Sequence, residues 1–273
     1  MSRSDSSSLD LLRRLIARPS SRSLRSPLKL FLGIMGIVTF LCGWEVATRL
    51  NLFAPEIPSP TQSANALLLM IADGSAVANV AASLFRVASG FAVGSSLAFF
   101  TCCIFWLSPT VRAICELSVD ALRPIPPVAL IPFAIFVLGL GNAPAIFLVT
   151  FAAFFPMQSV TDTGFSNAPR DQMDVARTFG ATNLQVLRYV VVPSARAAIM
   201  SGLKTSAAIS WFVVIVAELV GAQDGLGYLI EESRLSFQLD RAVAAIALIA
   251  VSGLFIQALI ALATMIVVGR DER

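Results

Sequence analysis

Two long apolar segments set the first limit on how this chain can fold. Residues 28–48 are interrupted only by Lys29 and Glu45, and residues 242–268 contain no charged residue. A helix needs about 20 residues to cross the ~30 Å hydrocarbon core of a bilayer, and lipid offers the backbone no other hydrogen-bond partner. Charged residues make up only 14% of the 273 residues, against about 25% in soluble proteins. The sequence therefore predicts an all-α integral membrane protein.

The apolar segments predict six membrane spans within one transmembrane domain, residues 30–268. A tail rich in serine and arginine, residues 1–29, precedes this domain, and residues 269–273 follow it. Polar residues and turn formers separate the apolar segments and define the approximate limits of the spans. These limits are 30–48, 80–107, 111–140, 142–161, 195–220 and 242–268.

The distribution of arginine and lysine predicts a multi-pass protein with both termini in the cytoplasm. Cytoplasmic segments next to spans are enriched in positive charge, and the tail is basic. Its charged residues are Arg3, Asp5, Asp10, Arg13, Arg14, Arg18, Arg22, Arg25 and Lys29. Six crossings then place the loops around Arg112 and at 170–188 inside, and the loops at 49–79, near Gly141 and at 221–241 outside. The tail is also expected to form a short helix along the lipid headgroups, because four of its apolar residues would lie on one helical face. The residues of that face are Leu9, Leu12, Leu15 and Ile16.

The third span contains a cluster of prolines. The segment Leu122-Arg-Pro-Ile-Pro-Pro-Val-Ala-Leu-Ile-Pro132 has four prolines in nine residues, and each removes a backbone donor and disfavours helix before it. A broken helix at membrane depth is tolerated only where protein or a water-filled cavity meets the freed carbonyls. We therefore expect Pro124, Pro126 and Pro127 to line the translocation pathway or to form a hinge. The alternative is a cytoplasmic loop followed by a shorter span from about Val128.

Charged residues inside spans are further candidates for function, because burying them in lipid is costly. Lys204 lies about ten residues into the fifth span and either serves an anion pathway or extends its amine to the membrane surface. Arg86 and Glu218 lie near the outer ends of two spans and are candidate gate or docking residues. Glu218 is ~21 Å from Lys204 along one helix, so these two cannot pair within it. Asp120 and Arg123 are spaced for a structural ion pair within a helix.

Several common kinds of site have no counterpart in the sequence. There is no histidine, and the cysteines lack the paired spacing of metal or redox motifs, so we expect them to be packing residues. The cysteines are Cys42, Cys102, Cys103 and Cys115. No G-x-x-x-x-G-K-[ST] sequence occurs, which excludes a P-loop. Gly139-Leu-Gly141 and Gly225-Leu-Gly227 are typical of turns and helix ends. We expect no enzymatic activity, no cofactor, no metal and no nucleic-acid binding in this chain.

A polar segment, residues 169–193, connects the fourth and fifth spans. Its first part, from Pro169, predicts a short amphipathic helix that ends at Gly180, where glycine permits a left-handed turn. Val175 and Phe179 form an apolar edge suited to a groove on a partner. A second helix, from about Leu184, leads back to the fifth span. The alternative is an ordinary amphipathic loop helix.

This segment resembles the cytoplasmic "EAA" loop of the membrane subunits of ATP-binding-cassette (ABC) importers. In that pattern an acidic residue and two alanines precede a glycine, and a proline follows about a dozen residues later. Valine stands here in place of the first alanine, and Val192 in place of the leucine usual before the proline. The resemblance implies that the residues coupled to an ATPase are Asp174, Val175, Ala176, Phe179, Gly180 and Pro193.

A wider resemblance covers roughly residues 55–268 and points to the permeases of the nitrate/sulfonate/taurine/bicarbonate importer group. The stretches that carry it are Ser59-Pro-Thr61, Ala82-Ser-Leu-Phe-Arg86, Gly90-Phe91, Leu122-Arg-Pro-Ile-Pro-Pro127, Ala129-Leu-Ile-Pro132, Val216-Ala-Glu218 and Gly225-Leu-Gly-Tyr-Leu-Ile230. It implies a type I importer fold in the cell inner membrane. The implied partners are a second permease copy that forms a homodimer with this chain, two ATPase subunits that bind ATP and Mg, and an extracytoplasmic solute-binding protein.

The resemblance also bears on the substrate. The sulfonate and taurine branch usually carries an Arg-Pro-Ile-Pro-Pro stretch like that at 123–127, whereas the nitrate and bicarbonate branch tends to a Ser-Pro variant. A small organic sulfonate is therefore the expected solute, with nitrate or bicarbonate as the alternative. Two other classes stay open, a self-sufficient secondary transporter and a membrane scaffold without transport activity.

Overall fold

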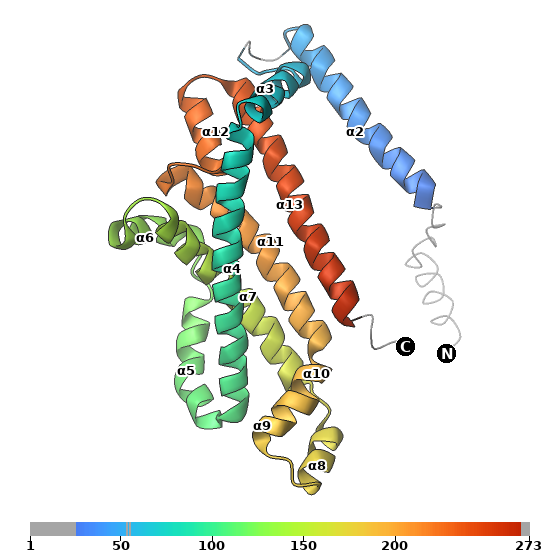
Figure 1. The fold of residues 1–273 in the computed structure, drawn as a ribbon, viewed down its shortest axis with the longest axis vertical. Helices are drawn as coiled ribbons and strands as arrows, with labels where there is room; N and C mark the ends of the chain where they lie inside the picture. The colour runs from blue at the N-terminus through green and yellow to red at the C-terminus, as the bar shows by residue number, and fades with distance from the viewer. Residues whose placement is uncertain (1–25, 53, 55, 269–273) are drawn as a thin grey trace, which may run out of the picture. The chain divides into compact units, whose positions relative to one another are not determined.

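The computed structural model describes residues 26–52, 54 and 56–268, and every regular element within them is a helix (Figure 1). The chain divides after Pro55 into two compact units. The headgroup helix predicted for the tail, most of the tail's basic residues and the segment 269–273 lie outside the described residues.

The first unit contains one described helix, α2, which runs from Ser26 to Arg49. Its segment Phe31–Arg49 is long and apolar enough to cross a membrane, as predicted for the first span. Large apolar side chains such as Phe31 and Phe40 are exposed along it, which suits a helix in lipid. An ion pair between Arg49 and Glu45, 2.8 Å apart, closes its last turn.

The second unit contains the other helices in the following order. They are α3 (Pro60–Ala72), α4 (Ser75–Leu107), α5 (Pro109–Leu122), η1 (Pro127–Leu130), α6 (Ile131–Leu138), α7 (Asn142–Ser166), α8 (Arg170–Thr178), α9 (Asn183–Val186), η2 (Leu187–Val191), α10 (Val192–Ser194), α11 (Arg196–Gly221), α12 (Leu226–Leu235) and α13 (Leu239–Val268).

Four helices of this unit, α4, α7, α11 and α13, are long and apolar enough to cross a membrane, and a bent pair of helices forms a further candidate. Figure 1 shows α8, α9 and the turn between α4 and α5 at one end of the unit, and α3, α12 and the start of α13 at the other. We call these the α8 end and the α12 end. With α2, the described residues thus contain the spans predicted from the sequence.

The bent pair lies where the third span was predicted. Helix α5 ends at Leu122, and the chain resumes as η1 and α6 at an angle of 88°. Because α6 has only 8 residues, it is too short to cross a bilayer alone. The prolines break the element as expected, and the segment Pro127–Leu138, where the alternative places a shorter span from about Val128, is also shorter than a helix that crosses a bilayer.

Helix α7 packs between α4 and α11, and small residues allow the close approach. A Cβ atom added at Gly94 of α4 would lie 2.4 Å from the Thr150 carbonyl oxygen of α7. One at Gly90 would lie 2.7 Å from Val149, and one at Gly164 of α7 would lie 2.6 Å from Ala198. Gly90 and Gly94 form a G-x-x-x-G motif, which brings helix backbones together in membranes, where the hydrophobic effect gives no drive for association.

We expect Gly94→Val to loosen the contact between α4 and α7, because the new side chain would meet backbone that cannot move aside. Overpacking of this kind costs about 1–3 kcal/mol, measurable as a lower unfolding midpoint of the detergent-solubilised protein. Gly36→Val on α2 is the matched control, since a Cβ there meets nothing within 4 Å. Equal midpoints for the two variants would contradict the proposed packing.

Candidate functional site

The helix predicted to face a partner is α8, which lies with α9 at one end of the second unit (Figure 1). It begins after Pro169, as the sequence predicts. Its Met173 and Ala176 pack against the buried cluster beneath it. Val175 and Phe179 face away from that cluster, and Phe179 is 87% exposed. One side of α8 is thus fastened to the protein, while the other presents an uncovered apolar edge.

Gly180 ends this helix with φ at +83°, the left-handed conformation expected from the sequence. The amide of Gly180 donates to the carbonyl of Arg177, and the amide of Ala181 donates to the carbonyl of Ala176 at 3.0 Å. This pair of hydrogen bonds is a Schellman motif. It fixes the direction in which the chain leaves α8.

The segment after Gly180 is anchored in the core. Thr182 and Gln185 form a capping box that starts α9. Val186, Leu187 and Val191 are buried, in a cluster that includes residues of α4 and α7. The other buried members of this cluster are Cys102, Phe165, Ala168 and Ala195. A displacement of α8 would therefore reach α4, α7 and α11 through packed side chains.

Two other members of the predicted coupling set lie in α8 and α10. Asp174 is exposed, and its carboxylate lies 3.4 Å from the Arg177 guanidinium. An exposed pair with this geometry adds little stability, so the acid can exchange this contact for one with a partner. Pro193 lies in α10, directly before α11, and its carbonyl accepts a hydrogen bond from Arg196 at 2.9 Å.

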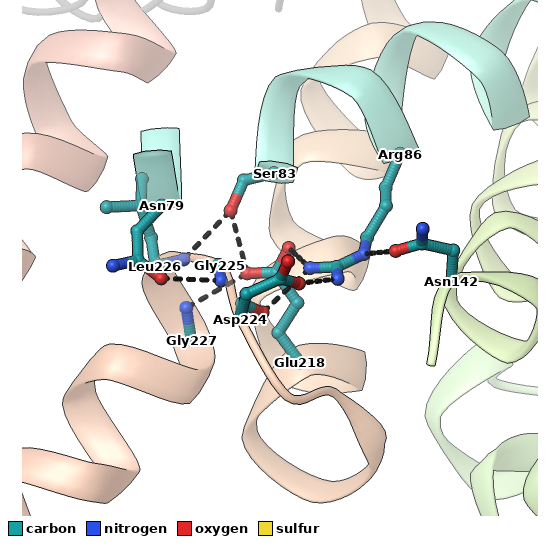
Figure 2. A network of polar contacts seen from close by, with 9 residues as sticks. All are labelled: Asn79, Ser83, Arg86, Asn142, Glu218, Asp224, Gly225, Leu226 and Gly227. Carbon is teal, nitrogen blue, oxygen red and sulfur yellow. Dashed lines mark hydrogen bonds and ion pairs between the residues drawn. The ribbon is translucent and has the colours of Figure 1, made fainter. Parts of the chain in front are cut away.

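A second site lies at the α12 end, where Arg86 of α4 and Glu218 of α11 form a buried ion pair. Their closest atoms, Nη1 and Oε1, are 2.7 Å apart, and each residue is 1% exposed. The other carboxylate oxygen, Oε2, accepts hydrogen bonds from the Ser83 hydroxyl at 2.8 Å and from the Gly227 amide at 3.0 Å. Both carboxylate oxygens thus have donors (Figure 2).

Arg86 also connects this pair to two further parts of the unit. Its Nε donates to Asn142 Oδ1 at the start of α7, at 2.7 Å. Its Nη1 donates to the Asp224 carbonyl at 2.8 Å, and its Nη2 contacts the Asp224 carboxylate. One guanidinium therefore joins α4, α7, α11 and the loop before α12 (Figure 2).

Glycines make room for this network. Gly225 has φ at +103°, and a Cβ there would lie 2.5 Å from the Glu218 carboxyl carbon. A Cβ at Gly227 would lie 2.3 Å from the carbonyl oxygen of Ile215. Gly225 directly precedes α12, so the interpretation of this Gly-Leu-Gly as a helix end is confirmed. Gly139 and Gly141 likewise flank the ends of α6 and α7.

A third candidate is a cavity of about 360 Å³ beside the break between α5 and α6. Arg123 and Pro127 line it from the break, and Phe151 and Ser159 line it from α7. Pro124 and Pro126 are not among its lining residues. Lys204 is exposed on α11 and does not line it either. The structure therefore brings only Pro127 of the predicted pathway residues to this cavity.

Two of these arrangements were not predicted from the sequence. Arg86 and Glu218 were both named as candidate gate or docking residues but not as a pair, although their opposite charges at similar predicted depth were a signal for pairing. The Asp120–Arg123 ion pair is present at 3.0 Å as expected, but the cavity next to Arg123 was not anticipated. Within the described ranges, no group of three or more His, Cys, Asp or Glu residues could hold a metal ion.

Comparison with known proteins agrees with this architecture. Residues 90–268 match the family described as "Binding-protein-dependent transport system inner membrane component". A putative aliphatic sulfonates transport permease protein of Escherichia coli (strain K12) is 32% identical over 211 residues, 77% of this chain and 80% of that protein. The taurine transport system permease protein of the same organism is 30% identical over 234 residues, 81% of this chain and 82% of that protein.

A solved structure shares the fold. The structure of the MetNI methionine ABC transporter in inward-facing conformations has a chain that superposes with a TM-score of 0.62 at 18% identity. The match covers 69% of this chain and 94% of that one. This likeness bears out the all-α membrane fold predicted from the sequence.

Proposed function

Because the chain belongs to the family of binding-protein-dependent transport system inner membrane components, we propose that it is the permease subunit of an ATP-driven importer for a small organic anion. The family and the apolar helices make it a multi-pass membrane protein. The similarity to sulfonate and taurine permeases also bears out the resemblance to the nitrate/sulfonate/taurine/bicarbonate group.

The arrangement of α8 is the observation that carries this proposal. An exposed Phe179 on a helix whose other side is buried is suited to a groove on a separate ATPase subunit, which would bind ATP and Mg. Movement of that groove would press on α8. The Schellman turn at Gly180 and the buried residues of α9 and η2 would transmit the push to the spanning helices, so that the pathway opens alternately to the two sides.

This proposal also orients the protein. The α8 end then lies in the cytoplasm, in agreement with its Arg170, Arg177 and Arg188. The α12 end, with the Arg86–Glu218 pair, faces outward, where a solute-binding protein would deliver the substrate. The same proposal includes docking of the solute-binding protein at the α12 end and a gating role for Arg86 and Glu218. It also includes a second copy of this chain as partner.

An aliphatic sulfonate such as taurine is the solute we favour. Two of the relatives are named for sulfonate or taurine transport, and residues 123–127 read Arg-Pro-Ile-Pro-Pro. Nitrate or bicarbonate is the alternative within the same group. Competition by these anions against taurine uptake into cells that carry the complete transporter separates the possibilities.

We expect Phe179→Asp to reduce ATP-dependent uptake about tenfold, the effect of losing one well-placed aromatic anchor at an interface. The fold should be unaffected, because the side chain is exposed. Phe179→Tyr is the matched control, since it keeps an aromatic ring at the same exposed position of α8. Uptake is measured in proteoliposomes that contain the permease, its ATPase and the binding protein.

Two outcomes would contradict the proposal. Full uptake by Phe179→Asp would show that α8 does not receive the ATPase. Uptake by this chain alone, in ATP-free liposomes under an ion gradient, would instead indicate a self-sufficient secondary transporter.

A further inference from the structure

The cavity beside the α5–α6 break lies at mid-depth in the second unit. Its lining residues Phe151, Phe155 and Ser159 come from the middle of α7, and Ile209 comes from the middle of α11. Its volume of about 360 Å³ falls within the range of small-molecule sites, roughly 300–1,000 Å³. A broken helix next to a cavity at this depth is the arrangement in which irregular backbone is tolerated inside a membrane.

Two prolines remove backbone donors around this cavity. Pro127 begins η1 after the break. Pro156 lies inside α7 and lines the cavity together with Ala152. A proline cannot donate to the carbonyl four residues earlier, which here is the carbonyl of Ala152. The wall therefore combines an apolar surface with local backbone polarity.

Among the described residues that line this cavity, Arg123 is the only charged one. Its Nη2 donates to Gln158 Oε1 at 3.0 Å and lies 3.0 Å from Asp120 Oδ1. Gln158 is buried and holds the guanidinium against α7. A guanidinium has five N–H groups. The three on Nε and Nη1 make no hydrogen bond to any residue in the described part of the chain, so they are available to an anion.

The rest of the wall is suited to an alkyl group. The rings of Phe151 and Phe155 are 4.9 Å apart in an edge-to-face arrangement, and Ile209 adds a further apolar surface. A small inorganic anion would gain nothing from this surface. A short alkyl chain that carries a sulfonate would bury its carbons against it while its oxygens accept hydrogen bonds from Arg123.

We propose that this cavity is the substrate contact site within the membrane, in which Arg123 binds the sulfonate group and the phenylalanines contact the alkyl chain of an aliphatic sulfonate. The inference rests on the proposed function and deepens it by assigning a site and a substrate class. It also gives Arg123 a second role beside its ion pair with Asp120.

The test uses a thiol placed in the cavity by Ser159→Cys. The full chain, with Cys103 and Cys115 replaced by alanine, is reconstituted in nanodiscs and labelled with the anionic reagent 2-sulfonatoethyl methanethiosulfonate or its trimethylammonium analogue. Cys42, which lies within the lipid-facing segment of α2, is also replaced by alanine, and the exposed Ser236 at the end of α12 is replaced by cysteine as the internal reference. After normalisation to position 236, we expect about a tenfold preference for the anionic reagent at position 159, as one nearby positive charge produces at short range.

Two further variants identify the source of this preference. Arg123→Gln should abolish it, and Arg123→Lys should retain part of it. Asp120→Asn should increase it, because the neighbouring negative charge is removed. An increase cannot result from misfolding, so this variant keeps the proposal falsifiable even if Arg123→Gln is unstable.

Competition identifies the anion. Millimolar ethanesulfonate should slow labelling at position 159, whereas nitrate should not, and neither anion should change labelling of the reference at position 236. Equal labelling by the two reagents, or equal protection by ethanesulfonate and nitrate, would overturn the proposal. The result is independent of ATP coupling, because Phe179→Asp should leave the labelling preference intact even where it stops uptake. Failure of the cavity and failure of the importer assignment are therefore distinguishable.

Discussion

Arg86→Met should lower the free energy of unfolding of the second unit by about 3–5 kcal/mol, the usual cost of leaving one member of a buried ion pair without its partner. Methionine keeps much of the length of arginine, so the main change is the loss of charge and donors. Glu218 would remain 1% exposed, with only the Ser83 hydroxyl and the Gly227 amide as donors. These two groups are neutral and cannot compensate a buried carboxylate.

A matched control exists in the first unit. Arg49 and Glu45 form an ion pair with nearly the same donor–acceptor distance, 2.8 Å against 2.7 Å, but the Arg49 side chain is 72% exposed. Arg49→Met should change stability by less than about 1 kcal/mol. Denaturant titration of the detergent-solubilised protein measures both variants.

The double variant Arg86→Met with Glu218→Met tests whether charge is the cause. With both charges gone, no uncompensated ion is buried, and apolar replacement of a complete pair is often neutral. Stability should therefore recover by at least half. A double variant no more stable than Arg86→Met alone would contradict this account and favour loss of the Asn142 and Asp224 contacts as the main cost.

The Arg86–Glu218 pair also bears on how the spans move. The guanidinium of Arg86, which belongs to α4, contacts α7, α11 and the loop before α12. These elements are therefore held together at the α12 end. A push at α8 then displaces a connected group of helices instead of bending one helix alone. Bistable movement of packed elements is how small displacements become large ones.

Some features were readable from the sequence because they depend on local chemistry. The spans follow from long apolar runs, and the limits of α8 follow from Pro169 and Gly180, which have specific backbone requirements. The break after Leu122 follows from the prolines. The start of α3 carries a local signal of the same kind, because Ser59 and Gln62 have the spacing of a capping box and form one.

Other features depend on contacts between distant segments. Arg86 and Glu218 are 132 residues apart in the chain, so their pairing requires the relative rotation of α4 and α11, which apolar periodicity alone does not determine. The cavity beside Arg123 arises where α5, α7 and α11 fail to fill the space at the break. No single segment encodes such a space.

Gly180→Val should reduce ATP-dependent uptake about thirtyfold, although a Cβ at this position meets nothing within 4 Å. The reason is conformational, since a β-branched residue is strongly disfavoured at positive φ. Strain of this kind costs about 1–3 kcal/mol. If the strain leaves the observed turn about 2 kcal/mol less stable than other conformations of this segment, only a few per cent of molecules would hold α8 in the geometry that couples to the ATPase.

Gly180→Asn separates backbone strain from loss of glycine as such. Asparagine adopts the left-handed conformation far more readily than valine, so this variant should keep most of the uptake. Combining Gly180→Val with Asp174→Arg should abolish uptake and its coupling to ATP hydrolysis while the chain still inserts into the membrane. Binding of the ATPase, measured by co-purification, should weaken in the same order as uptake. Equal uptake by the valine and asparagine variants would mean that the turn at Gly180 does not set the position of α8, and the transmission of force through α9 to α11 would then need another origin.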